Sequence, residues 1–106
     1  MLNFTNDNFK EQVLEADLPV LVDFFAVWCG PCQTAGPVIE ELAKEYEGKI
    51  KVGKLDIDEN RQTAADHNVM SVPTVAVFKK GKEVKRLVGF PGKEGYKQLI
   101  DGVLGS

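Results

Sequence analysis

The chain has few of the residues that metal-binding and disulfide-stapled proteins need. It contains two cysteines and one histidine among 106 residues, and these do not supply the four ligands of a structural zinc site. Cys29 and Cys32 would close a very small loop, and the entropic benefit of a disulfide shrinks with its loop. A chain of this length can bury a core without such a staple. The cysteine pair is therefore available for chemistry, and we expect no bound metal.

The sequence also lacks a long apolar run and an excess of positive charge. Thirteen basic and sixteen acidic residues give a net charge of -3, which repels nucleic acid and anionic lipid surfaces. Residues 1–7 have neither the basic nor the apolar region of a secretory signal, and no apolar run reaches the length that spans a bilayer. We expect a soluble, cytoplasmic monomer with neither nucleic acid nor a membrane as partner.

The hydrophobic pattern predicts alternating strands and helices. Residues 20–26 form a continuous apolar run that only Asp23 interrupts, as is typical of a buried parallel strand. From Pro31 to Tyr46 the apolar residues recur with helical spacing. Further strands are expected at 2–4, 50–58, 74–78 and 83–88, and further helices at 9–14, 61–67 (capped by Asn60) and 96–104.

This order of elements predicts an α/β fold over one domain, residues 1–106. Right-handed crossovers between the first three strands place helices on both faces of the sheet, and the closing hairpin adds an antiparallel edge. The result is a three-layer α/β/α sandwich. Functional crevices in such sheets lie at the carboxyl ends of strands, and Cys29 follows the central strand at that end.

The motif Trp28-Cys29-Gly30-Pro31-Cys32 resembles the active site of the thioredoxin family. The similarity covers essentially the whole chain: Val72-Pro73-Thr74 resembles the family's cis-proline loop, and Gly81 and Gly89 fall where the family has glycines. The resemblance implies a thioredoxin fold, with a five-stranded mixed sheet in the order 1-3-2-4-5 flanked by four helices.

The resemblance further implies a protein-disulfide reductase. Such a protein needs no cofactor beyond the redox-active disulfide within its own chain. It acts on disulfide-containing target proteins and is re-reduced by a thioredoxin reductase.

The two cysteines have distinguishable expected roles. Only a thiolate attacks a disulfide, and a free thiol with a pKa of about 8.5 is mostly protonated at pH 7. Cys29 precedes the helix that begins near Pro31, whose unpaired N–H groups and positive dipole end stabilise a thiolate. We expect Cys29 to attack and Cys32, one turn further in and less exposed, to resolve the mixed disulfide. Gly30 and Pro31 bring no cation to the site, which favours a reductant over an oxidant.

Asp23 is the second candidate catalytic residue, because a carboxylate inside an apolar strand is costly unless paired. Desolvation is expected to raise its pKa into the range useful for proton transfer. We expect Asp23 to take the proton of Cys32, while Lys54 lies nearby and restrains the rise. The alternative is a surface aspartate on a strand with one solvated face.

The expected substrate-docking surface depends on the proline loop. General statistics favour a trans Val72-Pro73 bond, whereas the resemblance implies a cis bond. If the bond is cis, Pro73 lies against the cysteines and the Val72 backbone can pair with an extended substrate strand. His67 is expected on a helix surface, without a catalytic role. The docking surface would consist of Trp28, Gly30, Pro31, Val72, Pro73, Gly89 and Phe90.

Two departures from the family pattern leave partner preference open. Gln33 and Met70 stand where many relatives carry a cation. Two other classes of function also remain open: a thioredoxin-like binding subunit in which the cysteines are dispensable, and a carrier that holds a metal or cluster between the cysteines of two subunits.

Overall fold

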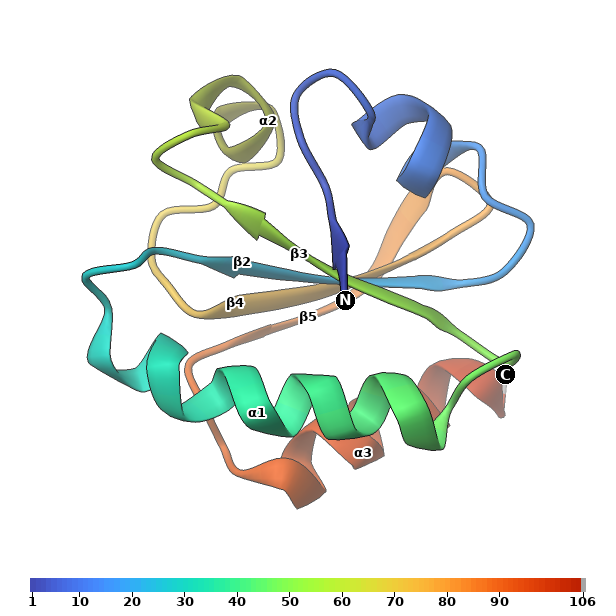
Figure 1. The fold of residues 1–106 in the computed structure, drawn as a ribbon. Coiled ribbons are helices and arrows are strands. Elements are labelled where there is room, and N and C mark those ends of the chain that lie inside the picture. The colour runs from blue at the N-terminus through green and yellow to red at the C-terminus, as the bar shows by residue number, and fades with distance from the viewer. Residues whose placement is uncertain (106) are drawn as a thin grey trace.

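A computed structural model describes residues 1–105 of the chain (Figure 1). Ser106, the end of the expected domain, lies outside the described residues. The strands are β1 (Leu2–Asn3), β2 (Val20–Phe25), β3 (Lys51–Asp56), β4 (Thr74–Lys79) and β5 (Lys82–Val88). The helices are the π-helix η1 (Lys10–Leu14) and the α-helices α1 (Gly30–Glu45), α2 (Arg61–Asp66) and α3 (Lys93–Leu104).

The strands form one mixed sheet in the order β1-β3-β2-β4-β5, as the resemblance implied. β1, β3 and β2 run parallel, β4 is antiparallel to β2, and β5 is antiparallel to β4. β2 therefore lies at the centre of the sheet with a strand on each side. Its residues are buried except Phe25, which is half-buried, and this explains why the sequence there is apolar on both faces.

The helices cover both faces of the sheet, and this confirms the three-layer sandwich. Figure 1 shows α1 and α3 on one face, and α2 with the blue N-terminal helix on the other. Successive residues of β2 point to opposite faces: Leu21 packs with Ile39 and Tyr96, whereas Val22 packs with Phe9 and Phe78. None of the described helices is long and apolar enough to cross a membrane.

The cap of α2 differs from the prediction. Asn60 precedes the helix but makes no side-chain capping bond. Instead Oδ1 of Asn6 accepts hydrogen bonds from Thr63 N and Thr63 Oγ1, at 3.0 and 2.7 Å. The Asn60 side chain turns back and accepts from Asn6 N at 2.9 Å. A loop distant in sequence thus caps α2, which spacing along the chain cannot reveal.

The expectation that His67 lies on a helix surface is wrong. α2 ends at Asp66, and the His67 ring is half-buried against Phe9 and Phe78, with ring centroids 4.9 and 5.4 Å apart. The apolar flank of an imidazole can fill such a gap between aromatic rings. His67 therefore packs against the core on the face of the sheet that η1 and α2 cover.

Candidate functional site

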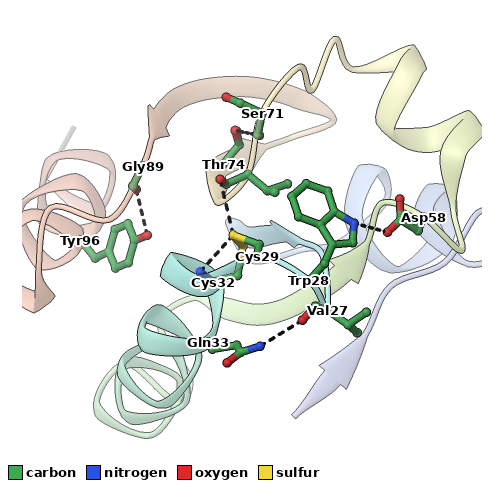
Figure 2. The surroundings of a disulfide bond; sticks show 11 residues. Val27, Trp28, Cys29, Cys32, Gln33, Asp58, Ser71, Thr74, Gly89 and Tyr96 are labelled. Atoms are coloured by element: carbon green, nitrogen blue, oxygen red, sulfur yellow. Dashed lines mark hydrogen bonds between the residues drawn. A yellow bond between two sulfur atoms is a disulfide. The ribbon is translucent and has the colours of Figure 1, made fainter.

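The cysteine pair lies where β2 ends and α1 begins (Figure 2). Cys29 has extended backbone geometry and is the N-cap residue of α1, and its Sγ accepts a hydrogen bond from Cys32 N at 3.2 Å. The two Cα atoms are 5.2 Å apart and a disulfide joins the side chains. Pro31 stands in the first turn of α1, where its missing N–H is no loss. The Cys29 sulfur therefore lies at the end of α1 that carries unpaired N–H groups.

The expected difference in exposure between the cysteines is absent. Cys29 is 4% exposed and Cys32 is 5% exposed, so accessibility does not separate an attacking sulfur from a resolving one. Their surroundings differ instead. The Cys32 amide points at Cys29 Sγ, and the N-terminus of α1 follows Cys29 directly. These contacts favour negative charge on Cys29.

The proline loop faces Cys29 from the other side. The Val72-Pro73 peptide bond is cis, as the resemblance implied. The Val72 carbonyl oxygen lies 3.6 Å from Cys29 Sγ, and Thr74 Oγ1 donates to the Ser71 carbonyl at 2.7 Å. The loop therefore presents its backbone beside the sulfur.

Gly89, the residue after β5, is hydrogen-bonded to the proline loop. Its N–H donates to the Pro73 carbonyl at 2.8 Å, while its own carbonyl accepts from Tyr96 Oη at 3.2 Å (Figure 2). Phe90 follows, half-buried, with its ring 5.7 Å from that of Tyr96. Gly89 thus connects the loop beside Cys29 to α3.

Trp28 is exposed, as expected of a residue at the rim of the site. Its side chain is 68% exposed, and Nε1 donates to Asp58 Oδ2 at 2.7 Å (Figure 2). Asp58 was not predicted, although it follows β3 at the same edge of the sheet as the cysteines, and that placement was a usable signal. Val27, Met70 and Val88 are further exposed apolar side chains near this edge.

Gln33 stands where the resemblance led us to expect a cation. Its Nε2 donates to the Val27 carbonyl at 3.1 Å, which ties α1 to the loop before Trp28 (Figure 2). Met70, the other departure, is 91% exposed. Neither position places a positive charge beside the cysteines.

Asp23 is buried, as predicted, and lines a cavity of about 430 Å³ together with Cys32 and Lys54. Burial raises the pKa of the Asp23 carboxyl from 3.8 to about 6, and the Lys54 ammonium lowers it by less. Within residues 1–105, Asp23 Oδ1 has no hydrogen-bond partner. The cavity therefore joins a carboxyl that titrates near neutral pH to the second cysteine. A larger hollow of about 620 Å³, between β1 and α1, does not reach the cysteines.

In the described part of the chain, no three His, Cys, Asp or Glu side chains are grouped as ligands for a metal. The two cysteines are joined to each other. The arrangement therefore suits exchange of a disulfide with another sulfur.

Comparison with known proteins gives one consistent family. A family model described as Thioredoxin matches residues 1–102. Thioredoxin 1 of Nostoc sp. is 47% identical over 97 residues, covering 92% of this chain and 91% of that protein. Thioredoxin of Staphylococcus haemolyticus is 48% identical over 101 residues, 95% of each chain. Thioredoxin of Staphylococcus aureus is 56% identical over 81 residues, covering 76% and 78% of the two chains.

Proposed function

This chain belongs to the thioredoxin family and is a thiol–disulfide oxidoreductase, and we propose that Cys29 attacks and Cys32 resolves when it reduces disulfides in other proteins. The observation that carries this assignment is the contact of Cys32 N with Cys29 Sγ at the N-terminus of α1. The amide and the helix end stabilise a thiolate on Cys29 in preference to Cys32.

The exchange proceeds in two displacements. The Cys29 thiolate attacks one sulfur of a target disulfide, forms a mixed disulfide and releases the other target sulfur as a thiolate. Deprotonated Cys32 then attacks Cys29 Sγ, forms the Cys29–Cys32 disulfide and releases the second target sulfur. Two electrons pass from the cysteine pair to the target, whose two sulfurs leave as thiolates and take up protons from the surrounding solution. The cysteine pair supplies both electrons, so the reaction needs no further cofactor.

Asp23 is proposed to take the proton of Cys32 in the second step, directly or through a water. Its burial, its raised pKa and the cavity that it shares with Cys32 support this role. Lys54, on the same cavity, lowers the pKa of the Asp23 carboxyl and so opposes part of the rise that desolvation causes.

Substrate docking is proposed along the proline loop and the rim of the site. The Val72 carbonyl stands beside Cys29 Sγ, where an extended target segment can pair with the backbone while its disulfide meets the sulfur. The exposed indole of Trp28 supports an apolar contact on the other side. Residues assigned to this surface are Trp28, Gly30, Pro31, Val72, Pro73, Gly89 and Phe90.

The partners and setting are also part of the proposal. We assign re-reduction of the disulfide to a thioredoxin reductase, and we place the protein in the cytoplasm as a single-domain monomer. Family membership supports the reductase. Coupled assays with an NADPH-linked and a ferredoxin-linked reductase would identify the electron donor.

Two cysteine variants test the assignment of roles. With a disulfide-bonded substrate such as insulin, Cys32→Ser should accumulate a mixed disulfide that is visible by mass spectrometry under non-reducing conditions. Cys29→Ser should accumulate none, because the remaining thiol lacks the Cys32 amide contact. The opposite pattern would reverse the roles.

The wild-type protein tests the alternative of a binding subunit. A binding module with dispensable cysteines would leave insulin unreduced in wild type and in Cys29→Ser alike. Turnover by wild type and its loss in Cys29→Ser would exclude that alternative.

The role of Asp23 is tested by the pH dependence of turnover. Asp23→Asn keeps the shape of the side chain but cannot accept a proton, so resolution by Cys32 should slow. An unchanged rate of insulin reduction from about pH 6 to about pH 9 would remove Asp23 from the mechanism.

A further inference from the structure

Tyr96 is buried behind the docking surface and takes no part in the exchange described above. It lies in the first turn of α3 with no exposed surface, and its ring packs in the same core cluster as Leu21 and Val75. Its hydroxyl donates to the Gly89 carbonyl at 3.2 Å (Figure 2). A buried hydroxyl is costly without a partner, so this hydrogen bond restrains both groups.

Gly89 needs such a restraint. Its φ of 91° lies in the left-handed region, and a Cβ built on it would meet nothing within 4 Å. Without a Cβ, glycine samples more backbone conformations than any other residue. The two hydrogen bonds of Gly89, to Tyr96 and to Pro73, orient its peptide groups.

The same glycine connects α3 to the sulfur. Gly89 N donates to the Pro73 carbonyl at 2.8 Å, and the preceding Val72 carbonyl lies 3.6 Å from Cys29 Sγ. Burial and the Asp23 charge both raise the pKa of the Tyr96 hydroxyl. Tyr96 therefore remains a protonated donor throughout the working range of the protein.

We infer that Tyr96 is a positioning residue for protein substrates: its hydroxyl holds Gly89, and through Gly89 the Pro73 carbonyl, in the arrangement that receives an extended target strand. This inference rests on the proposed docking along Val72 and Pro73. It implies that Tyr96 affects targets that pair with the backbone more strongly than small disulfides that reach Cys29 without pairing.

The test compares Tyr96→Phe with Tyr46→Phe. Tyr46 is a matched control, because its hydroxyl also donates a hydrogen bond, to Asp101 Oδ1 at 2.7 Å. This bond joins the C-terminal cap of α1 to α3, away from the proline loop. Each variant keeps its ring and loses one hydrogen bond.

The first measurement is kcat/KM for insulin and for the small disulfide 5,5′-dithiobis(2-nitrobenzoic acid). In Tyr96→Phe the kcat/KM for insulin divided by that for the small disulfide should fall about fivefold, mainly because KM for insulin rises. A change of this size is what the loss of one neutral hydrogen bond supports. In Tyr46→Phe the ratio should stay at the wild-type value. Equal slowing of both substrates in Tyr96→Phe would overturn the inference.

The second measurement is amide hydrogen exchange at Gly89, which does not depend on activity. The Gly89 N–H bonds Pro73, so loss of the Tyr96 hydroxyl should speed its exchange, whereas Tyr46→Phe should not. Equal exchange in the two variants would overturn the inference even if both were active. If wild type reduced no insulin, the docking proposal would fail, and Gly89 exchange would still decide whether Tyr96 holds the loop.

Discussion

Asp23 and Lys54 are register partners across the parallel pair of β2 and β3. The Lys54 ammonium lies 5.2 Å from the centroid of the Phe25 ring and is near enough to Asp23 to lower its pKa. The central strand therefore carries a buried acid whose pKa is raised by desolvation and lowered by less through a lysine of the neighbouring strand. The protonation of Asp23 therefore affects both the free energy of unfolding and the proposed proton transfer from Cys32.

Replacing Asp23 by asparagine should stabilise the protein above pH 6. The carboxyl has a pKa of 3.8 when unfolded and about 6 when folded, so between these values the folded state binds more protons. Stability of the wild type therefore falls as pH rises through this window, by about 3 kcal/mol at about 1.36 kcal/mol per pKa unit.

Urea unfolding of the oxidised proteins at a series of pH values would measure this difference. Asp23→Asn should gain up to about 3 kcal/mol over wild type near pH 8, and the advantage should largely disappear near pH 4. A pH-independent difference between the two proteins would contradict the raised pKa.

Replacing Lys54 by methionine should raise the pKa of Asp23 further. The change removes the cation that opposes desolvation and keeps most of the apolar stem. The chemical shift of the Asp23 carboxyl carbon, followed by NMR over a range of pH, would give this pKa directly.

Lys51→Met is the matched control on the same strand, because the Lys51 ammonium bonds the backbone and side chain of Gln12. Lys51→Met should therefore leave the pKa of Asp23 at its wild-type value. An equal shift in both variants would show that general charge, and not the Lys54 contact, acts on Asp23.

Asn6→Ala should destabilise the fold by about 1 to 2 kcal/mol, the usual cost of losing a helix cap that satisfies buried groups. The change removes the acceptor of Thr63 N and Thr63 Oγ1. Urea midpoints measure the loss. Gln62→Ala, at an exposed position of α2, should cost much less because the Gln62 side chain donates its hydrogen bond to Asp66 at the surface.

Two glycines should respond to alanine in opposite directions. A Cβ on Gly53 would lie 2.5 Å from Cε2 of Phe4, so Gly53→Ala overpacks the core and should cost about 1 to 3 kcal/mol. A Cβ on Gly36 meets nothing within 4 Å, and alanine is the better helix former by up to about 1 kcal/mol. Thermal melts of the two variants should therefore shift to opposite sides of wild type.

Much of the fold follows from local patterns. The apolar run of β2, the helical spacing of α1 and the hairpin between β4 and β5 each depend on neighbouring residues, and each appears in the structure. The first expected helix is the exception, since it is a five-residue π-helix. Its short apolar pattern contains too few residues to specify the type of helix.

The site was predicted where the chain itself carries the signal. The cysteine motif, the exposed Trp28 and the buried Asp23 are visible in sequence because an unusual residue stands in a distinctive context. The Tyr96 contact and the Asn6 cap were missed, because their partners lie 7 and 57 residues away and only folding brings them together. Asp58 was also missed, although its position after β3 was a usable signal.

The sequence by itself determined the chemistry of this protein: two cysteines at the start of a helix and an acid within a buried strand define a thiol–disulfide site from local residues alone. The tertiary structure decided how the residues of that site are held relative to one another. Register sets Lys54 beside Asp23, equal burial removes exposure as the difference between the cysteines, and hydrogen bonds through Gly89 connect α3 to the proline loop. These relations depend on distances between segments, which spacing along a chain does not specify.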